Sequence, residues 1–412
     1  MSLKKFKCRV CKKKLKDYLC DLGHSPLANS FLKNKTLIAE EKYYPLKVYY
    51  CKKCFLPQLP EFVLAKKIFQ KYDYFSSYSK SWLEHSKKYV NEIIKDIKLS
   101  KKDKICEIAS NDGYLLQFFK KKGFDVLGIE PAKNIAAVSI KKKIKTLNYF
   151  FNFDNSKKIK KKFGKQNLII CNNVYAHVPD ILDFTRGLKE LIAEDGIITI
   201  EFPHYYNLIN SLQFDTIYHE HFSYLSLHST TNILKKFELE IFKVKKVNTH
   251  GGSLRIYIKN KNFKKFKIAK SYHNIFELEK KSNIFSKKTF VKFSKNIEEI
   301  RINFVKCLID IKIKEKKVVA YGAAAKGNTF LNYCNIDKSL ISFIVDKNPS
   351  KIGKLLPGSH LPILPINELY KNNPDYIIIL PWNIKDEVIK QIKAKKLKNK
   401  FITAIPKFKI YK

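Results

Sequence analysis

Arginine is scarce in this 412-residue chain, although the chain is strongly basic. The formal net charge is +44 at pH 7, yet arginine occurs only at Arg9, Arg186, Arg255 and Arg301. Base-specific contacts to nucleic acid favour the planar guanidinium of arginine over the ammonium of lysine. Lysine-rich runs such as 157–162 are spread over the whole chain. We therefore attribute the charge to overall composition and expect no nucleic-acid partner.

Long apolar runs are also missing. No run reaches the ~18 apolar residues that a membrane-spanning helix needs, and the basic N-terminus lacks the apolar segment of a signal peptide. We expect a cytoplasmic protein that does not associate with membranes. The hydrophobic fraction of 45% is typical of a folded globular chain, and the length predicts two or three domains.

Two cysteine pairs with C-x-x-C spacing lie near the N-terminus. Cys8 and Cys11 form one pair, and Cys51 and Cys54 form the other, with 39 residues between them. Four thiolates in this arrangement can bind zinc tetrahedrally, whereas a disulfide pair is disfavoured in a reducing compartment. Cys20 and His24 lie between the pairs as possible substitute ligands. We predict a structural zinc-binding module over residues 1–70.

The middle of the chain has the pattern of a doubly wound α/β sheet, which we assign to residues 71–260. A helix over 81–97, with Ser79 as its N-cap, leads into it. We predict strands at 105–109, 126–129, 168–171 and 196–202, and an antiparallel hairpin over 239–259. The first strand–helix turn has Gly113 but no G-x-G-x-x-G motif, so it suits a cofactor without a pyrophosphate group. Glu130 ends the second strand, where it would accept hydrogen bonds from ribose hydroxyls.

Residues 261–412 repeat the pattern on a smaller scale. After a lysine-rich helical stretch to about residue 316, a strand, a glycine turn and a helix follow over 318–328. Further strands are expected at 341–345 and 376–380. We predict a second Rossmann-like domain. The helix N-terminus with Lys326 would hold a phosphate, although a purely structural turn explains the glycine equally well.

Protic side chains are most concentrated in residues 215–224, D-T-I-Y-H-E-H-F-S-Y. Phenol, imidazole and carboxylate groups there can all transfer protons or polarise oxygen atoms. The H-E-H sequence lacks the H-E-x-x-H spacing of zinc proteases. A second stretch rich in aromatic and hydroxyl groups, residues 72–79, either caps the following helix or lines the same site.

Taken in order, these elements describe a class I S-adenosylmethionine-dependent methyltransferase. The motifs E-I-A-S-N-D-G-Y-L-L, N-V-Y-A-H-V and Y-H-E-H-F-S-Y, together with the cysteine pairs, resemble the sugar C-methyltransferase family over essentially the whole chain. That family acts on nucleotide-linked keto-deoxysugars. The chain departs from it at Ala109, where the family usually has glycine; we expect the small methyl group to be tolerated.

The resemblance implies roles for individual residues. His221 would be the base that removes a C–H proton, with Glu220 orienting it or a neighbouring residue. Tyr218 and His177 would donate to the keto oxygen, and Tyr72 would line the cavity. His219 is expected to face away, and His204 has no assigned role.

The resemblance also implies two binding sites and the molecules that fill them. S-adenosylmethionine would contact Tyr74, Glu107, Ser110, Asn111, Gly113, Tyr114, Leu115, Glu130, Pro131, Asn172 and Asn173. The nucleotide-sugar, expected to be dTDP-linked, would contact Tyr321, Gly322, Lys326, Asn328 and Asp346. The enzyme would be a monomer or a homodimer. Two alternatives remain: methylation of oxygen or of a small non-sugar molecule, and a zinc-containing RNA-binding protein.

Overall fold

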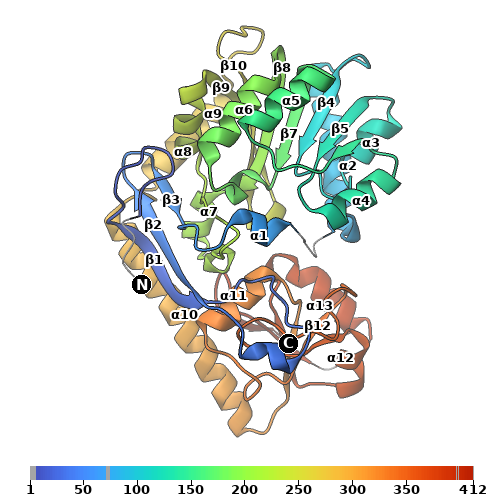
Figure 1. Cartoon of the computed structure of the whole chain (residues 1–412). Coiled ribbons are helices and arrows are strands. Elements are labelled where there is room, and N and C mark those ends of the chain that lie inside the picture. Colours follow the sequence, from blue (N-terminus) through green and yellow to red (C-terminus); the bar gives the residue numbers. More distant parts are fainter. Residues whose placement is uncertain (1–5, 71–74, 396, 398, 412) are drawn as a thin grey trace.

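A computed structural model describes residues 6–70, 75–395, 397 and 399–411 of the chain. It contains three β-sheets that follow one another along the sequence (Figure 1). The predicted fold class is confirmed: a Rossmann-like sheet stands between a small cysteine-containing module and a second α/β sheet. Among the helices of the described residues, none combines the length and the apolar character that crossing a membrane requires.

The first sheet is antiparallel and carries both cysteine pairs at one end. Its strands are β1 (Tyr18–Ser25), β2 (Tyr44–Cys51) and β3 (Leu56–Gln58), with η1 (Lys35–Ile38) between the first two and α1 (Ala65–Phe69) after the third. One cysteine pair forms the β2–β3 turn. Leu46, Val48 and Tyr50 alternate along β2 and are buried in a core shared with the long helix α10 (Lys287–Ile313). The module therefore does not pack alone.

The middle sheet has seven strands in the order β6-β5-β4-β7-β8-β10-β9, with β10 antiparallel to its neighbours. This is the sheet with a terminal antiparallel hairpin that the sequence predicts. The strands are β4 (Lys104–Ile108), β5 (Asp125–Ile129), β6 (Thr146–Leu147), β7 (Gln166–Asn172), β8 (Ile192–Pro203), β9 (Leu239–Val247) and β10 (Ser253–Asn260).

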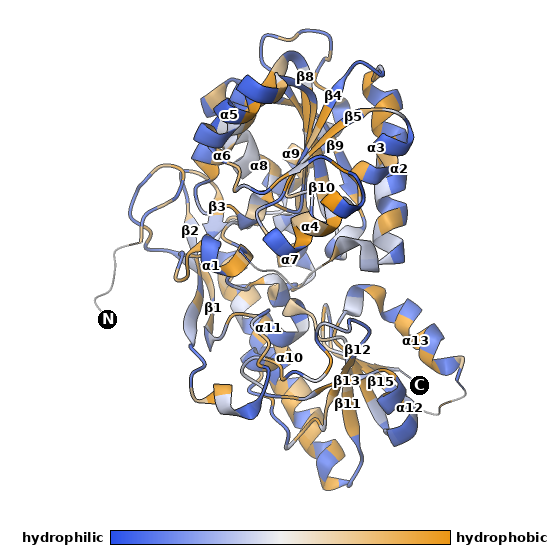
Figure 2. Cartoon of the chain, turned by 45° about the vertical axis from the view of Figure 1, so that its right-hand side comes forward, coloured by the Kyte–Doolittle hydropathy of each residue, from blue (hydrophilic) through white to orange (hydrophobic). Residues whose placement is uncertain are grey.

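Helices cover both faces of this sheet because its central strands are apolar on both sides. Along β7, Leu168 and Ile170 pack on one face, and Ile169 and Cys171 pack on the other. The first face carries α2 (Lys80–Ile97) and α3 (Leu116–Lys121); the second carries α5 (Phe153–Phe163), α6 (Ile181–Leu191) and α8 (Leu227–Leu234). Ser79 accepts from the Trp82 N–H, which confirms it as the N-cap of α2. Figure 2 shows the hydrophobic strands lying beneath the more polar helices.

The remaining helical elements of this part lie between its strands or after the last one. They are η2 (Ser76–Tyr78), α4 (Lys133–Lys141), η3 (Tyr175–His177), α7 (Tyr205–Asn210), η4 (Phe214–Thr216), η5 (Lys235–Phe237), η6 (Thr249–Gly251) and α9 (Lys270–Lys281).

The C-terminal sheet has six strands in the order β13-β12-β11-β14-β15-β16, all parallel except β16. The strands are β11 (Val318–Tyr321), β12 (Ile344–Asp346), β13 (Ile363–Pro365), β14 (Tyr376–Ile379), β15 (Lys400–Thr403) and β16 (Lys409–Tyr411). The helices are α11 (Ala325–Tyr333), α12 (Asn367–Asn372), η7 (Trp382–Ile384) and α13 (Lys385–Lys393).

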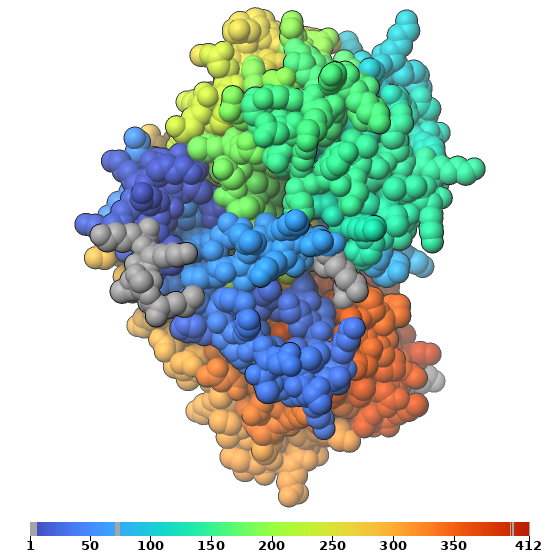
Figure 3. All heavy atoms as spheres, in the orientation of Figure 1, coloured from blue at the N-terminus to red at the C-terminus, as the bar shows by residue number. Residues whose placement is uncertain are grey.

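The N-terminal segment lies across the junction between the other two parts (Figure 3). It reaches the C-terminal part through a bridge between Leu32 and Leu355. The middle and C-terminal parts also meet directly, because the Trp382 indole donates to the Asp215 carboxylate at 2.7 Å. Residues from all three parts thus surround the loop that carries the H-E-H sequence.

Candidate active site

The turn after β4 has an unusual backbone that brings several predicted cofactor residues together. Ala109, Asn111 and Gly113 all have positive φ angles, of 58°, 50° and 75°. A side chain at Gly113 would collide with Ile144. Ala109, where the family usually has glycine, has a backbone conformation that favours glycine.

Glu130 holds this turn through its carboxylate. One oxygen accepts from the Asn111 N–H at 2.9 Å, and the other accepts from the Ala132 N–H at 2.8 Å. Burial raises the pKa of Glu130 to about 7, although both backbone donors favour its charged form. Glu130 therefore organises the turn as well as standing at the position predicted for ribose contacts.

Buried polar atoms without partners gather at the same edge of the sheet. Within the part of the chain that the structure describes, Oδ1 of Asn172 and both amide atoms of Asn173 lack hydrogen-bond partners, and the buried Glu107 carboxylate has only the Tyr114 side chain beside it as a hydrogen-bonding group. Burial raises the pKa of Glu107 well above its usual value; a hydrogen bond with Tyr114 opposes this shift, and the carboxylates of Glu130 and Asp112 add to it. Since buried polar groups are normally paired, this edge requires a polar ligand.

The remaining predicted cofactor residues lie around this edge. Tyr114 and Leu115 are buried directly after the turn, Ser110 lies within it, and Pro131 follows Glu130. Tyr74 falls outside the described residues.

His177 and His221 form the centre of the candidate catalytic site. Their ring centroids lie 4.6 Å apart. His177 Nδ1 lies 2.9 Å from the Glu220 carbonyl, and His221 Nδ1 lies 2.7 Å from the Thr216 carbonyl. A carbonyl oxygen only accepts, so each Nδ1 carries a proton and each neutral ring keeps its lone pair on Nε2.

Burial keeps both rings neutral. It lowers the pKa of His177 to about 4 and that of His221 well below 6.5. The neighbouring His177 and, more weakly, Lys326 lower the pKa of His221 further. A neutral imidazole with a basic Nε2 is the form that a general base requires.

The other residues of the H-E-H segment point in different directions. The Tyr218 ring lies against His221, with centroids 4.1 Å apart. The Glu220 carboxylate accepts from the Asn29 side chain at 2.6 Å, while its carbonyl holds His177. Glu220 thus orients His177 through its carbonyl, and Thr216 orients His221 in the same way. Thr216 was not among the residues predicted from the sequence. Tyr72 lies outside the described residues.

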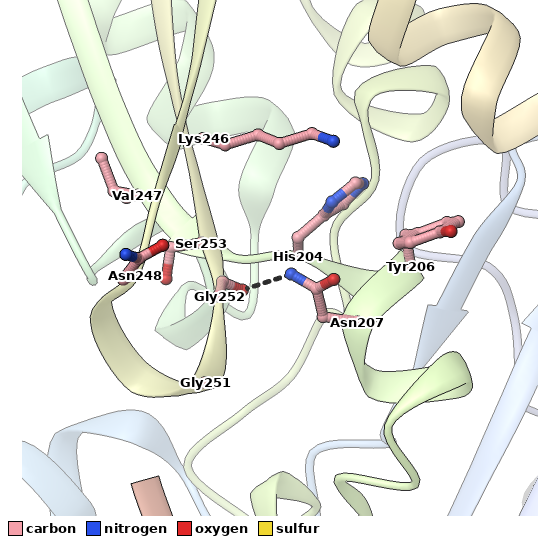
Figure 4. Close-up of a pocket in the computed structure, with 9 residues that line it drawn as sticks. All are labelled: His204, Tyr206, Asn207, Lys246, Val247, Asn248, Gly251, Gly252 and Ser253. Carbon is pink, nitrogen blue, oxygen red and sulfur yellow. Dashed lines mark hydrogen bonds between the residues drawn. The ribbon is translucent and has the colours of Figure 1, made fainter. Parts of the chain in front are cut away.

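His219 and His204 lie away from this pair. His219 is directed at the N-terminal module, with Nε2 3.2 Å from the Pro45 carbonyl. His204 binds the buried Glu279 carboxylate at 2.7 Å. It lines a separate cavity of about 310 Å³ beside the β9–β10 turn, together with residues such as Lys246 and Asn207 (Figure 4). Among the described residues, none of those predicted for the site lines that cavity.

Lys326 extends from the C-terminal part towards the histidine pair. Its Nζ donates to the His250 carbonyl at 3.0 Å and lies 5.3 Å from the Trp382 ring centroid. Burial lowers the pKa of Lys326, and the Asp215 carboxylate partly offsets this effect.

The other predicted substrate residues are structurally engaged. Asp346 accepts from the N–H groups of Ala323 and Asn348, at 2.7 and 2.8 Å. The Asn328 amide donates to the Ala28 carbonyl at 3.3 Å. Gly322 has a φ angle of 94° and packs against Pro381. Burial raises the pKa of the neighbouring Tyr321 to about 12.

Sequence reasoning missed a buried ionic cluster at the end of β8. Glu201 is fully buried and accepts from Arg255 at 2.6 and 3.0 Å, from Thr249 at 2.9 Å, and contacts His85 Nε2 at 3.1 Å. Burial opposes ionisation of Glu201, but His85 and Arg255 outweigh it and lower its pKa to about 2. The available signal was an arginine that stands between the apolar residues Leu254 and Ile256 of a hairpin strand.

The four cysteines of the N-terminal pairs are assembled for a metal ion. Their sulfur atoms all lie within 4.8 Å of one another, and three of the residues are buried. The Cys51 and Cys54 thiols hold the pKa of Cys8 well below its ordinary value, while hydrogen bonds to Cys51 and Cys8 raise the pKa of Cys54.

Comparison with known proteins assigns this architecture. Residues 8–69 match a zinc binding domain family, 82–244 a methyltransferase domain and 248–406 the C-methyltransferase C-terminal domain. C-methyltransferase NovU of Streptomyces niveus is 30% identical over 403 residues, which cover 97% of this chain and 95% of NovU. The chain belongs to the C-methyltransferase family. The C-methyltransferase uses S-adenosylmethionine as methyl donor and has a zinc-binding N-terminal domain.

Solved structures resemble part of this C-methyltransferase. The PH0226 protein of Pyrococcus horikoshii is 12% identical, with a TM-score of 0.35, and the match covers 48% of this chain and 99% of that one. An S-adenosylmethionine-dependent methyltransferase of Clostridium acetobutylicum is 12% identical, with a TM-score of 0.33, and the match covers 43% of this chain and 91% of that one.

Proposed function

We propose that this C-methyltransferase methylates a carbon atom next to the ketone of a nucleotide-linked deoxysugar, through an enolate. A sugar carbon becomes nucleophilic only after losing a proton, and an adjacent ketone delocalises the resulting charge onto oxygen. The observation that carries the proposal is the pair of neutral histidines, 4.6 Å apart, for whose Nε2 atoms the described residues supply no hydrogen bond.

His221 is assigned as the base. Its Nε2 takes the C–H proton, and the Thr216 carbonyl stabilises the imidazolium that forms through the Nδ1–H. The Tyr218 phenol beside it is the donor for the enolate oxygen. Neutral His177 presents an acceptor at Nε2, so it fits a second proton acceptor better than the oxygen donor that the resemblance implies. Lys326 would stabilise negative charge from the C-terminal side.

The polar groups at the carboxyl edge of the middle sheet support S-adenosylmethionine binding there; this cofactor supplies an electrophilic methyl group when bound. The buried Glu107 carboxylate suits the ammonium group, and Glu130 retains lone pairs for ribose hydroxyls beyond those used by the turn. Asn172 and Asn173 offer further unpartnered amide atoms at the end of β7.

The nucleotide part of the substrate, expected to be dTDP, is assigned to the C-terminal domain, with Tyr321, Gly322, Asn328 and Asp346 around β11. Because Asp346 already occupies the Ala323 N–H, this carboxylate disfavours a phosphate at the start of α11. Lys326 is the cation on that side whose charge acts on His221.

Solvent exchange tests the enolate directly. In D₂O without methyl donor, the wild-type enzyme should exchange the C–H next to the sugar ketone, as detected by NMR. His221→Asn should lose this exchange and lower turnover by ~10²–10⁴. His219→Asn is the matched control, since His219 faces the N-terminal module. Exchange at the wild-type rate in the His221 variant would refute the assignment, and a product methylated on oxygen would refute C-methylation of this substrate.

A further inference from the structure

The zinc-binding module pairs directly with the loop of residues 218–224, which we call the catalytic loop. The Leu59 N–H donates to the Phe222 carbonyl at 3.0 Å, and the Tyr224 N–H donates to the Pro57 carbonyl at 3.0 Å. These bonds extend β3 into the loop. Since β3 begins two residues after the last cysteine of the cluster, the metal site and the catalytic loop are joined by a short, hydrogen-bonded segment.

The other side of the catalytic loop is bonded to the segment that carries His177. The N–H groups of Phe222 and Ser223 both donate to the Ala176 carbonyl, at 2.9 and 3.2 Å. The Glu220 carbonyl accepts from His177 Nδ1. The catalytic loop therefore lies between β3 and the His177 segment, and a displacement of β3 would change the spacing of both histidines.

Arg9, which lies between Cys8 and Cys11 in the sequence, links these segments through hydrogen bonds of its side chain. Its Nη1 donates to the Pro179 carbonyl at 2.7 Å, and its Nη2 donates to the Leu59 carbonyl at 2.6 Å. The guanidinium also lies 5.6 Å from the Phe222 ring centroid. One side chain thus contacts the extension of β3, the catalytic loop and the segment after His177.

Gln58 forms hydrogen bonds both to Arg9 and to the cysteine cluster. Its Oε1 accepts from the Arg9 N–H at 2.9 Å, and its Nε2 donates to Cys8 Sγ at 3.4 Å. Gln58 is only 2% exposed. The position of the Arg9 backbone is therefore set by the cysteine cluster and by β3 together.

We propose that Arg9 is a positioning residue, through which the zinc-ordered first cysteine pair sets the geometry of His177 and His221. The inference rests on the catalytic roles proposed above for these histidines. The structural metal then has a specific role, because it holds in place a guanidinium that spans three backbone segments far apart in sequence. A misplacement of about 1 Å at reacting groups costs about 10²-fold in rate, so such a residue matters without touching substrate.

Hydrogen exchange measured by mass spectrometry tests this in the full-length zinc-loaded enzyme. Arg9→Ala should speed amide exchange at least about tenfold in peptides covering 174–180 and 218–224. Arg9→Lys, which keeps the charge and one donor group, should restore part of the protection. Lys47→Ala is the matched control, because Lys47 pairs with Asp21 at 3.2 Å within the same module. Zinc content and S-adenosylmethionine affinity should stay at wild-type values in all three variants.

With the proposed sugar as substrate, Arg9→Ala should lower kcat by about 10²-fold while KM changes little. Unchanged exchange in both peptides would overturn the inference. Loss of zinc from both Arg9 variants would also overturn it, because Arg9 would then be needed to build the metal site itself. Exchange and cofactor binding require no sugar, so a wrong substrate assignment would leave these two measurements interpretable.

Discussion

His177 and His221 donate their Nδ1 protons to two backbone carbonyls and face each other at a ring distance of 4.6 Å. Both acceptors are main-chain atoms, which do not titrate. The tautomers are therefore fixed by the fold rather than by a carboxylate, and burial disfavours protonation of either ring.

The pH dependence of activity should reflect this burial. Because the folded-state pKa of His221 is lowered below the ordinary imidazole value of 6.5, the base stays neutral at pH 7. Activity should be lost on acidification only below pH 6.5, where the imidazole takes up a proton. A profile of kcat/KM against pH measures this limb. An acid limb centred above the ordinary imidazole value would contradict the assignment of a buried neutral histidine as base.

Lys326→Met should move that acid limb upward. The Lys326 charge lowers the pKa of His221, so its removal makes the imidazole easier to protonate. The same kcat/KM profile measures the shift, and a lower overall rate is also expected because charge stabilisation is lost. Lys385→Met is a suitable control, since Lys385 lies at the start of α13 and pairs locally with Asp386. An unchanged limb in the Lys326 variant would show that its charge does not reach His221.

Glu130→Ala should weaken S-adenosylmethionine binding by roughly 1.5–3 kcal/mol, the cost of losing hydrogen bonds to a charged group. Two effects contribute, since the variant loses ribose acceptors and also releases the Asn111 and Ala132 N–H groups. Isothermal calorimetry gives the dissociation constant. Asp154→Ala, on the exposed start of α5, should leave it unchanged. Wild-type affinity in the Glu130 variant would exclude this carboxylate from the cofactor site.

Ala109→Gly should stabilise the protein by roughly 0.5–1 kcal/mol. Glycine relieves the ~1–2 kcal/mol cost of a left-handed alanine, against a smaller entropic cost in the unfolded chain. Denaturant unfolding measures the difference. The opposite change is expected for Ala136→Gly in α4, where glycine lowers helix stability by about 1 kcal/mol. Destabilisation by Ala109→Gly would mean that the methyl group contributes packing that exceeds the strain.

Cys51→Ser should release zinc, which metal analysis should find at about one ion per chain in the wild type. Metal binding at such sites is coupled to folding, so the variant should also unfold at lower temperature. Protein prepared without chelators but lacking zinc would refute the four-cysteine site. Cys307→Ser, on α10 and outside the cluster, provides the control.

The strands and the position of the histidines were predictable because their signals are local. Largely apolar runs ending at 109, 129 and 171 define the central strands, and each is followed by polar residues at the carboxyl edge. The partners of those residues were not predictable. Thr216 acts through its backbone carbonyl, which every residue type has, so its identity gives no signal. Asn29 contacts Glu220 although it lies 191 residues away in the sequence, and no local pattern predicts that contact.

The C-terminal turn shows the limit of reasoning from a pattern. A strand, a glycine and a helix predict free N–H groups for a phosphate. In the structure, Asp346 instead accepts from the Ala323 N–H of the turn before the helix, in the way that Glu130 accepts from the Asn111 N–H in the middle sheet. The sequence alone does not show which acidic side chain turns inward and accepts a hydrogen bond from a nearby backbone N–H. The domain limits at residues 70 and 260 remain predictions.

The shared core of the first sheet, α10 and the C-terminal strands constrains how this enzyme can be re-engineered. Leu46 and Val48 are buried together with Phe293 and Ile344, although these pairs belong to distant parts of the chain. A chimera that borrows only a foreign substrate domain would expose one half of that core. Interchangeable parts should instead be cut so that residues 8–59 and 205–224 travel with 284–405, because Tyr205, Phe214 and Ile217 lie in the same core and the metal cluster needs all four cysteines. The cofactor sheet is then the recipient scaffold.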